Sequence, residues 1–289
     1  MSVAAGVAPA PVALPAPVPG FPTGWCIRAK PDAFADAKAA GYEYVELALQ
    51  DVLSLSDEEF AKLVSQLQAT GLPALSGYNS VPKELRLVGP EVDVAKIDAH
   101  LEKLLARAAT LKLRYLILNA GASWKIPEGT PAEEAFTQLA DFGRKFATAA
   151  AKHQITVLVE PLRSTDSNQI TTIAEAVKLV EAVNHPYFAM MVDYSFLTIQ
   201  NDDPANLLKA GKHLRHVHIS NPANKRAYAM ADSESDYASF FKALKQIDYH
   251  GGLSVHGGTT PATFASDASR AITFLRTKAQ VLAAKSLGN

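Results

Sequence analysis

The sequence predicts a single-domain α/β protein with the (β/α)8 architecture of a TIM barrel. Short apolar runs alternate with helical patterns from Phe21 onward, and eight such units fit in about 265 residues. The apolar runs are nearly continuous, as expected for parallel strands buried on both faces. No glycine-rich phosphate turn follows an early strand, and this disfavours a doubly wound open sheet.

The strands are expected where the apolar runs lie, at residues 24–29, 42–49, 73–80, 114–121, 156–160, 188–193, 214–220 and 251–256. Helical spacing of apolar residues predicts the segments between them, at residues 31–42, 56–73, 92–112, 131–153, 171–183, 205–213, 235–247 and 261–284. Local signals set the boundaries. Ser56 with Glu59 three residues later is typical of a capping box, and Gly71 before Pro73 is a stop signal.

Composition excludes several classes of protein. Hydrophobic residues make up 48% and charged residues 20% of the 289, which is ordinary for a soluble enzyme. A net charge of -1 offers no global attraction to nucleic acid or to an anionic membrane, so we expect neither as a partner. The single cysteine, Cys26, rules out an internal disulfide and disfavours a thiolate zinc site. No apolar run reaches the roughly 18 residues of a membrane span.

Residues 1–20 differ from the rest. They are rich in Ala, Pro and Val and carry no charged side chain, so we expect an extended arm ahead of a barrel at 21–289. The arm lacks the basic start and uninterrupted apolar core of a signal peptide. We therefore expect a cytoplasmic protein, or a periplasmic one if the arm is the remnant of an export signal.

Two carboxylates end neighbouring strands near the middle of the chain. The run from Thr156 to Val159 ends in Glu160, and the run from Phe188 ends in Asp193. A charged side chain at the end of a buried strand is costly to remove from water unless it is paired or has a function. The carboxyl ends of parallel strands meet at one mouth, where barrels of this kind place their chemistry.

Other strand ends bring further polar residues to the same mouth. In chain order the strand tips carry Glu46, Asn79, Asn119, Glu160, Asp193, His218 and His256. Because side chains alternate along a strand, Glu160, Asp193, His218 and His256 are expected to converge from four consecutive strands, with His216 one layer deeper. Two carboxylates and two imidazoles suit one divalent ion such as Mn²⁺, Zn²⁺, Co²⁺, Fe²⁺ or Mg²⁺, and do not suit Ca²⁺. The alternative is that the carboxylates cap loops and the histidines belong to the core.

Several segments together resemble the xylose-isomerase-like TIM barrels of the sugar phosphate isomerase/epimerase type. The resemblance spans about Gly24 to Arg276 and rests on GYEYVEL, NSVPKELRLVGPEVDV, EPLRSTDSNQITTIAEAVKLVEAVNHP, MMVDYSF, LRHVHISNPANKRAY and SDYASFFKALKQIDYHGGLSVH. The superfamily includes ketose 3-epimerases, hydroxypyruvate isomerases, inosose dehydratases, lyases of 3-oxo-glycosides and apurinic-site endonucleases.

The resemblance implies a metal-dependent site. Its ligands would be Glu160, Asp193 and His218, plus the residue at the tip of the last strand, here His256. It also implies that Glu46, Asp166 and Arg226 face the substrate. To these we add Asn79 at a strand tip and Lys125 in a neighbouring loop as substrate-binding candidates. Barrels of this family are often homo-oligomers, and Mn²⁺ is the ion we expect.

Two departures from the family pattern matter. In the ketose epimerases the last ligand is a glutamate that doubles as an acid/base, whereas this chain has His256. A family histidine three residues after Asp193 is replaced by Phe196. A two-carboxylate proton shuttle therefore cannot run unchanged, because a metal-bound neutral imidazole is a poor second base.

We expect an isomerase or epimerase that acts on a sugar or keto-sugar through an enediolate, with Glu160 and His256 as catalytic residues. Lys125 and Arg226 would bind hydroxyl, carboxylate or phosphate groups, and Trp124 and Tyr194 are candidates for stacking on a sugar. A first alternative is a lyase that eliminates from a 3-oxo-glycoside or dehydrates a keto-polyol. A second is a metal-free sugar-binding or non-catalytic barrel subunit. An apurinic-site endonuclease would need more histidine ligands and a basic groove.

Overall fold

Eight parallel strands close into a barrel in which each strand pairs with the next and β1 pairs with β8. The structure is a computed structural model and describes residues 23–27, 31–223, 225–227, 235–258 and 262–284. The strands are β1 (Thr23–Ile27), β2 (Tyr44–Ala48), β3 (Ala74–Tyr78), β4 (Tyr115–Leu118), β5 (Thr156–Val159), β6 (Phe188–Asp193), β7 (Leu214–Ile219) and β8 (Gly252–Val255). The predicted TIM barrel is confirmed. The expected arm at residues 1–20 lies outside the described residues.

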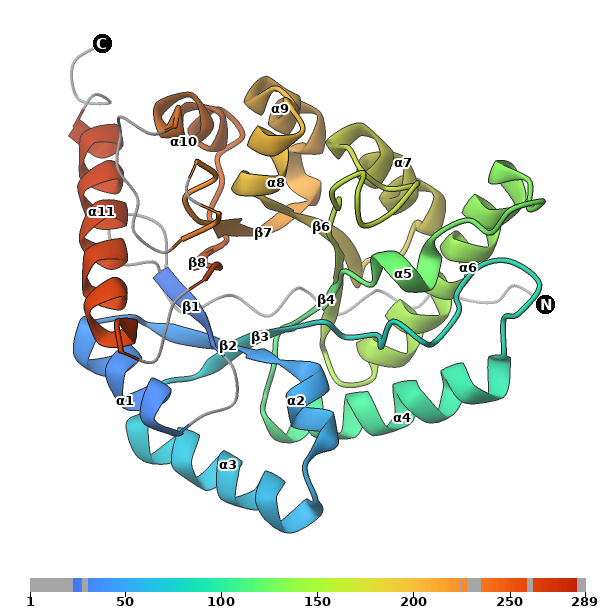
Figure 1. Ribbon diagram of the computed structural model, residues 1–289, viewed down its shortest axis with the longest axis horizontal. Helices are drawn as coiled ribbons and strands as arrows, with labels where there is room; N and C mark the ends of the chain where they lie inside the picture. The colour runs from blue at the N-terminus through green and yellow to red at the C-terminus, as the bar shows by residue number, and fades with distance from the viewer. Residues whose placement is uncertain (1–22, 28–30, 224, 228–234, 259–261, 285–289) are drawn as a thin grey trace, which may run out of the picture.

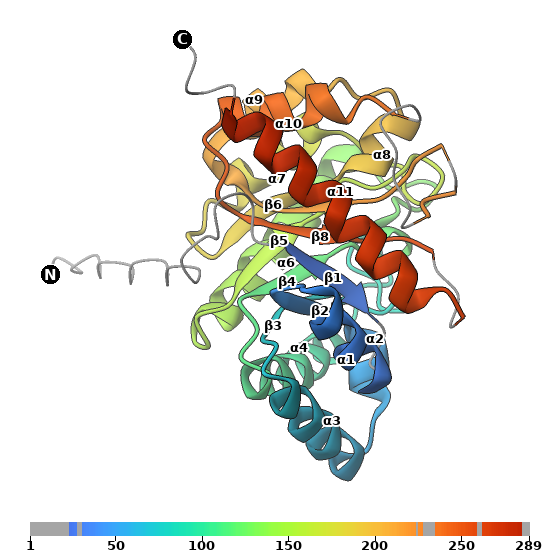
Figure 2. The same cartoon turned by 90° about the vertical axis from the view of Figure 1, so that its left-hand side faces the viewer.

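A ring of helices surrounds the strands (Figure 1). The longer ones are α1 (Pro31–Ala40), α3 (Asp57–Thr70), α4 (Val94–Thr110), α6 (Ala132–Ala151), α7 (Ile173–Val183), α10 (Tyr237–Gln246) and α11 (Phe264–Ala284). Helix α11 lies beside α1 and closes the ring where the two ends of the barrel sequence meet (Figure 2). None of the helices in the described part of the chain is long and apolar enough to cross a membrane.

Several short helices depart from the sequence-based expectation. The helix expected at residues 205–213 is broken into η1 (Pro204–Asn206), α9 (Leu207–Ala210) and η2 (Gly211–His213), and Gly211 has a positive φ of 46° at the break. Three more follow strands β2, β4 and β6, namely α2 (Leu49–Ser54), α5 (Gly121–Trp124) and α8 (Tyr194–Ile199). One or two turns contain too few residues for a periodic signal. These helices matter because they shape the barrel mouth.

Helix boundaries follow the local signals. Ser56 accepts a hydrogen bond from the Glu59 amide while the Glu59 carboxylate accepts one from the Ser56 amide, so the predicted capping box is present. Gly71 ends the helix in the left-handed conformation at φ 67°. Thr172 and Glu175 form a second capping box at the start of α7, directly after the loop that leaves β5.

The alternation of side chains along the strands decides what reaches the barrel interior. On β7, Val217 and Ile219 pack outward in the large core between strands and helices, while His216 and His218 point inward and are fully buried. Between β2 and β6, the interior holds a smaller apolar cluster of Ala48, Tyr78, Ile117, Leu158, Ala189 and Met191. The charged and imidazole side chains of the deeper interior, Glu46, His216 and His218, come from β2 and β7.

Candidate metal centre at the barrel mouth

The four predicted ligands come together at the carboxyl ends of β5 to β8. The Nδ1 atoms of His218 and His256 are 2.9 Å apart. His218 Nδ1 lies 3.8 Å from Glu160 Oε1, and His256 Nδ1 lies 3.7 Å from Asp193 Oδ2. Asp193, His218 and His256 each offer a ligand atom within 4.8 Å of the others. Glu160 and Asp193 are buried, whereas the side chain of His256 keeps 20% of its surface exposed toward solvent.

Glu160 is the member of this group whose charged form is disfavoured by its surroundings. Its side chain is fully buried, and among the described residues neither carboxylate oxygen has a partner with good hydrogen-bond geometry, although the side-chain amide of Asn119 lies close enough to lower its pKa. Burial, reinforced by the nearby charge of Asp193, raises the pKa of Glu160 to about 8, although Arg226 and the amide of Asn119 act in the opposite direction. A buried carboxylate without a well-formed hydrogen bond is typical of a group that transfers a proton or binds a metal ion.

Asp193 is held in place on both oxygens. Oδ1 accepts the Ser195 amide at 2.8 Å, which fixes the start of α8, and Oδ2 accepts from the Arg226 guanidinium at 2.6 Å. Burial by itself would raise the pKa of Asp193, but Arg226 and His256 hold it below its usual range. The Arg226 guanidinium also lies over the ring of Phe196, 4.4 Å from its centre. Asp193 is therefore ionised, and each of its oxygens accepts a hydrogen bond.

His218 is neutral and oriented. Burial lowers its pKa to about 4, against the opposing effect of Glu46. Its Nε2 atom lies 2.9 Å from Glu46 Oε2, and its Nδ1 atom points toward Glu160 and His256. A neutral imidazole whose far nitrogen is hydrogen-bonded to a carboxylate is the usual form of a metal-ligating histidine.

Glu46, a predicted substrate-binding residue, contacts the candidate ligand His218. Its side chain is fully buried below the ligands, where it contacts His216 and His218 and accepts from Ser254 Oγ at 2.5 Å. Although burial by itself raises the pKa of Glu46, the two histidines hold it well below its usual value. Glu46 is linked to the other candidates through His218, whose Nε2 contacts Glu46 and whose Nδ1 faces Glu160 and His256.

The donor set fits a divalent transition ion. Two imidazole nitrogens that face each other at 2.9 Å need a proton or a cation between them. The unpartnered carboxylate of Glu160 and the ionised Asp193 supply two negative charges beside them. Nitrogen and oxygen donors in this ratio suit Mn²⁺, Fe²⁺, Co²⁺ or Zn²⁺ better than Ca²⁺.

The substrate-side candidates occupy different places around the mouth. Asn79 is exposed at the end of β3, where its amide donates to Asn119 Oδ1 at 2.8 Å. Lys125 is exposed at the end of α5. Asp166 accepts two hydrogen bonds from Arg163, at 2.7 and 3.0 Å. Arg226, at the metal cluster itself, is the candidate that the structure brings nearest to the predicted ligands.

The two aromatic candidates are packing residues. Trp124 is fully buried and donates from Nε1 to Ser167 Oγ at 3.0 Å. Tyr194 is 2% exposed and packs against Tyr237 and Phe240. Neither ring is available to stack on a sugar.

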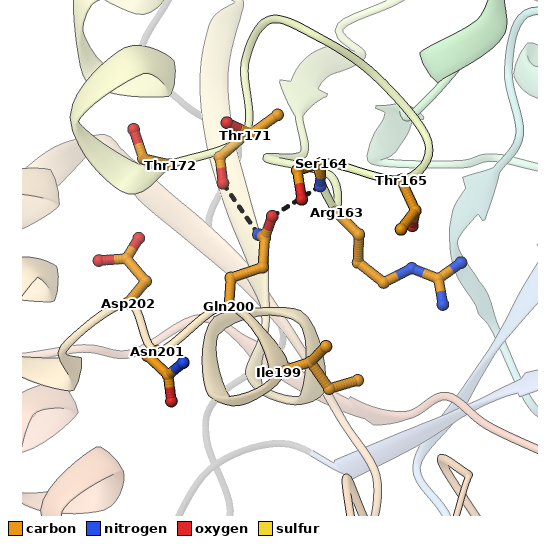
Figure 3. Close-up of a pocket in the computed structure, with 9 residues that line it drawn as sticks. All are labelled: Arg163, Ser164, Thr165, Thr171, Thr172, Ile199, Gln200, Asn201 and Asp202. Atoms are coloured by element: carbon orange, nitrogen blue, oxygen red, sulfur yellow. Dashed lines mark hydrogen bonds between the residues drawn. The ribbon is translucent and has the colours of Figure 1, made fainter.

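A cavity of about 610 Å³ lies beside the mouth, between the loop after β5 and the end of α8 (Figure 3). It is lined by Arg163, Ser164, Thr165, Thr171, Thr172, Ile199, Gln200, Asn201 and Asp202. Gln200 joins its two sides, since Oε1 accepts from the Ser164 amide at 2.7 Å and Nε2 donates to Thr171 at 3.0 Å. Figure 3 shows Arg163 extending away from Gln200. The Arg163 guanidinium lies 5.2 Å from the centre of the Phe196 ring, and the Arg226 guanidinium packs against the same ring.

Sequence reasoning missed two parts of this site. Arg163 stands in the loop directly after Glu160, and its position gave no signal because loop geometry decides where it points. Ser254 is one layer below His256 on β8, so strand alternation could have placed it inside the barrel. A serine at an inward position of an otherwise apolar strand could have indicated a buried polar contact inside the barrel.

The curated relatives of the chain are sugar epimerases. It is 29% identical over 236 residues to an L-ribulose 3-epimerase of Methylomonas sp. (strain DH-1), covering 80% of this chain and 79% of that protein. It is 29% identical over 244 residues to a ketose 3-epimerase of Arthrobacter globiformis, covering 81% and 78%. These relatives confirm the predicted sugar isomerase/epimerase class, and they do not favour the lyase alternative.

Solved structures show the same fold. A D-psicose 3-epimerase determined in the presence of D-fructose superposes with a TM-score of 0.77 at 19% identity and covers 90% of this chain and 99% of that one. A D-allulose 3-epimerase from Methylomonas sp. in complex with D-allulose gives 0.74 at 23% identity and covers 90% and 97%. A family model described as "Xylose isomerase-like TIM barrel" matches residues 34–277. The chain is therefore a member of the xylose isomerase-like TIM-barrel family.

Proposed function

We propose that the chain is a divalent-metal-dependent ketose 3-epimerase whose ion is held by Glu160, Asp193, His218 and His256. The observation that carries the proposal is the carboxylate of Glu160, which is fully buried and unpartnered among the described residues and has a pKa raised to about 8. A base with a pKa near the working pH is suited to removing a proton from carbon next to a carbonyl. The ketose 3-epimerase relatives support the choice of substrate class.

The residues divide into ligands and proton carriers. The ion, for which we expect Mn²⁺, supplies Lewis-acid charge that makes the proton next to the substrate carbonyl more acidic. Asp193 and His218 serve only as ligands, since their second polar atoms already bond to Ser195 and Glu46. Glu160 and His256 both lie beside His218 Nδ1, at 3.8 and 2.9 Å, and we assign the proton transfers to these two residues.

The proton transfers follow from this placement. Glu160 takes the proton from C3 as the C3–H bond breaks, and the electron pair forms the C2–C3 double bond while the carbonyl pair moves to oxygen. A proton returned to the opposite face of C3 inverts that centre. We assign the return of this proton to His256, whose side chain is 20% exposed and can be reprotonated from solvent. Exchange with solvent then resets both groups.

The substrate-binding roles rest on charge and exposure. Arg226 reaches the cluster from the loop after β7 with a side chain 21% exposed, so a sugar hydroxyl can compete for its remaining N–H groups. Asp166 accepts from Arg163, and Arg163 lines the cavity beside the mouth. Asn79 and Lys125 are exposed at the ends of β3 and α5. We propose that these groups bind the hydroxyls remote from C3.

The test is a comparison of wild type with Glu160→Gln in heavy water. Metal-loaded wild type is incubated with a panel of free ketopentoses and ketohexoses, and proton NMR follows C3. Epimer formation with deuterium at C3 supports the proposal, and Glu160→Gln must lose both signals. Label at C1 with an aldose product would show an aldose–ketose isomerase in its place. Sugar binding with no exchange would show a non-catalytic barrel.

A further inference from the structure

A buried hydrogen-bond network lies under the metal ligands and crosses the barrel interior from β2 to β7 and β8. Its centre is Glu46, whose carboxylate contacts His216, His218 and Ser254. All four side chains are fully buried. Tyr44 Oη lies 3.0 Å from Ser254 Oγ and extends the network toward the lower end of the barrel. Burying an ionised carboxylate so deep in a barrel has a large desolvation cost, so we expect it to have a role that explains its presence there.

The chemistry of Glu46 decides the protonation of His218. An ionised carboxylate has acceptors and no donors, so the ring nitrogen that contacts it must carry the hydrogen. His218 Nε2 lies 2.9 Å from Glu46 Oε2 and therefore donates. The other nitrogen, Nδ1, is then a bare lone pair, and it points at His256 Nδ1 and Glu160 Oε1. Only this tautomer of His218 can bind an ion at the mouth.

Glu46 is itself held in position. Oε1 accepts from Ser254 Oγ at 2.5 Å and contacts His216 Nε2, which leaves Oε2 directed at His218. The His216 ring lies edge-on to the His218 ring, with the ring centres 5.4 Å apart. The carboxylate therefore has one orientation that satisfies all three partners.

We propose that Glu46 is a positioning residue that fixes the Nδ1 lone pair of His218 toward the metal, and that Ser254 and His216 hold Glu46 for this purpose. The inference deepens the proposed function and rests on it. It also gives Glu46 a role different from contact with substrate. Carboxylates behind metal-binding histidines set the tautomer and ring orientation in this way, and their loss typically weakens metal binding about 10- to 100-fold.

The same atoms could hold an ion of their own, since Glu46, His216 and His218 offer three ligand atoms within 4.8 Å of one another. We favour hydrogen bonds there because Ser254 donates to the carboxylate and both histidine Nε2 atoms contact it, and an ionised carboxylate can only accept from them. An ion would have to displace hydrogens from two buried rings. The number of ions bound per chain separates the two arrangements.

Ser76 provides a matched control. It pairs in register with Glu46 on the neighbouring strand β3, and it is equally buried. Among the described residues its hydroxyl has no hydrogen-bond partner. Ser76→Ala therefore removes a buried polar atom at the same depth of the barrel without touching either histidine.

The experiment uses the full chain with Glu46→Gln, Ser254→Ala and Ser76→Ala. The Glu46→Gln change keeps the size of the side chain but leaves only one oxygen that can accept, so one histidine must face the new NH₂ group. Long-range ¹H–¹⁵N NMR of ¹⁵N-histidine protein, freed of metal by chelation, reports the tautomer of His218, with His218→Asn used for assignment. Titration with Mn²⁺ and Co²⁺ then gives affinity and stoichiometry, and thermal unfolding confirms that each variant is folded.

We expect wild-type His218 to carry its proton on Nε2 and to bind one ion per chain. Glu46→Gln should populate the other tautomer or broaden the signal and weaken metal binding about 10- to 100-fold, with kcat recovering at saturating metal. Ser254→Ala should lie between that variant and wild type, and Ser76→Ala should stay within about twofold of wild type.

Each failure has its own signature. If wild type binds metal but Glu46→Gln leaves both the His218 tautomer and the affinity at the level of Ser76→Ala, the positioning role is overturned. Two ions per chain, with the second lost in Glu46→Gln, would overturn it as well by making Glu46 a ligand. If wild type binds no ion at all, the proposed function fails, and the tautomer data still show whether Glu46 sets the His218 proton.

Discussion

The Nδ1 atoms of His218 and His256 face each other at 2.9 Å across the barrel mouth. The first belongs to β7 and the second follows β8, and these strands pair in parallel with His218 opposite Ser254. Two side chains at successive strand tips are thus aimed at one point, beside the buried carboxylates of Glu160 and Asp193. The two nitrogens need a proton or a cation between them, and our proposal that a cation binds there rests on the two carboxylates beside them.

Removal of the His256 imidazole should cost metal affinity. His256→Ala deletes one of four ligands, and we expect the dissociation constant for Mn²⁺ or Co²⁺ to rise at least about tenfold. His250→Ala is the control, because that histidine is exposed near β8 and pairs only with a surface aspartate, Asp248, in the contacts of the described residues. Equal affinity of His256→Ala and His250→Ala would remove His256 from the ligand set.

The stability of the metal-free protein should fall as pH rises. Glu160 has a pKa of about 8 when folded and near 4.5 when unfolded, so the folded state holds an extra proton between these values. Its contribution to stability is complete below about pH 4.5 and is lost as pH rises through 8. Glu160→Gln mimics the protonated form, so its melting temperature should exceed that of wild type by at least about 2 °C at pH 9.

The two proteins should converge near pH 5, where Glu160 is protonated. The measurement is thermal unfolding in chelator from pH 5 to 9. A difference that stays constant over this range would show that Glu160 does not titrate within it.

Metal affinity should have the opposite pH dependence. An ion that binds Glu160 must displace the proton that the raised pKa retains, so affinity rises with pH until about pH 8 and then levels off. Displacement of one proton gives up to about a tenfold gain per pH unit. Calorimetric titration with Mn²⁺ in buffers of different ionisation enthalpy measures the proton release. Release of no proton at pH 7 would contradict a Glu160 ligand.

Loss of the Arg226 charge should separate metal binding from substrate binding. Its guanidinium donates to Asp193 at 2.6 Å and repels a cation at that carboxylate. Arg226→Gln should therefore bind metal more tightly, while KM for the ketose rises about 10- to 100-fold through the lost charge-assisted hydrogen bond. Arg270→Gln, at an exposed position on α11, is the control. Weaker metal binding with an unchanged KM would assign Arg226 a purely structural role.

The sequence was sufficient for the barrel and for the gathering of ligands. Continuous apolar strands ending in Glu160 and Asp193, together with inward alternation on β7, follow from the period of a strand and the closure of the barrel. The position of Glu46 could not be read in this way. Strand alternation shows that Glu46 points inward, but its depth relative to His218 depends on the register between strands on opposite sides of the barrel.

The positions of the loop arginines and of Trp124 also could not be predicted from the sequence. Arg163 and Arg226 lie against the same Phe196 ring although 63 residues separate them in the chain, a contact that only the packed loops create. Trp124 was a candidate for sugar stacking from its loop position, yet the short helix α5 turns it into the core. Helices of one turn leave too little periodicity to reveal this.

The most direct test of the account is the site of deuterium incorporation when chelator-treated, Mn²⁺-reloaded protein acts on ketoses in heavy water. We predict label at C3 of both epimers, dependent on metal and absent in Glu160→Gln. No exchange with Mn²⁺, Co²⁺ or Zn²⁺ across free and phosphorylated ketoses, or exchange that survives in Glu160→Gln, would contradict the central claim that this mouth is a metal-dependent epimerase site.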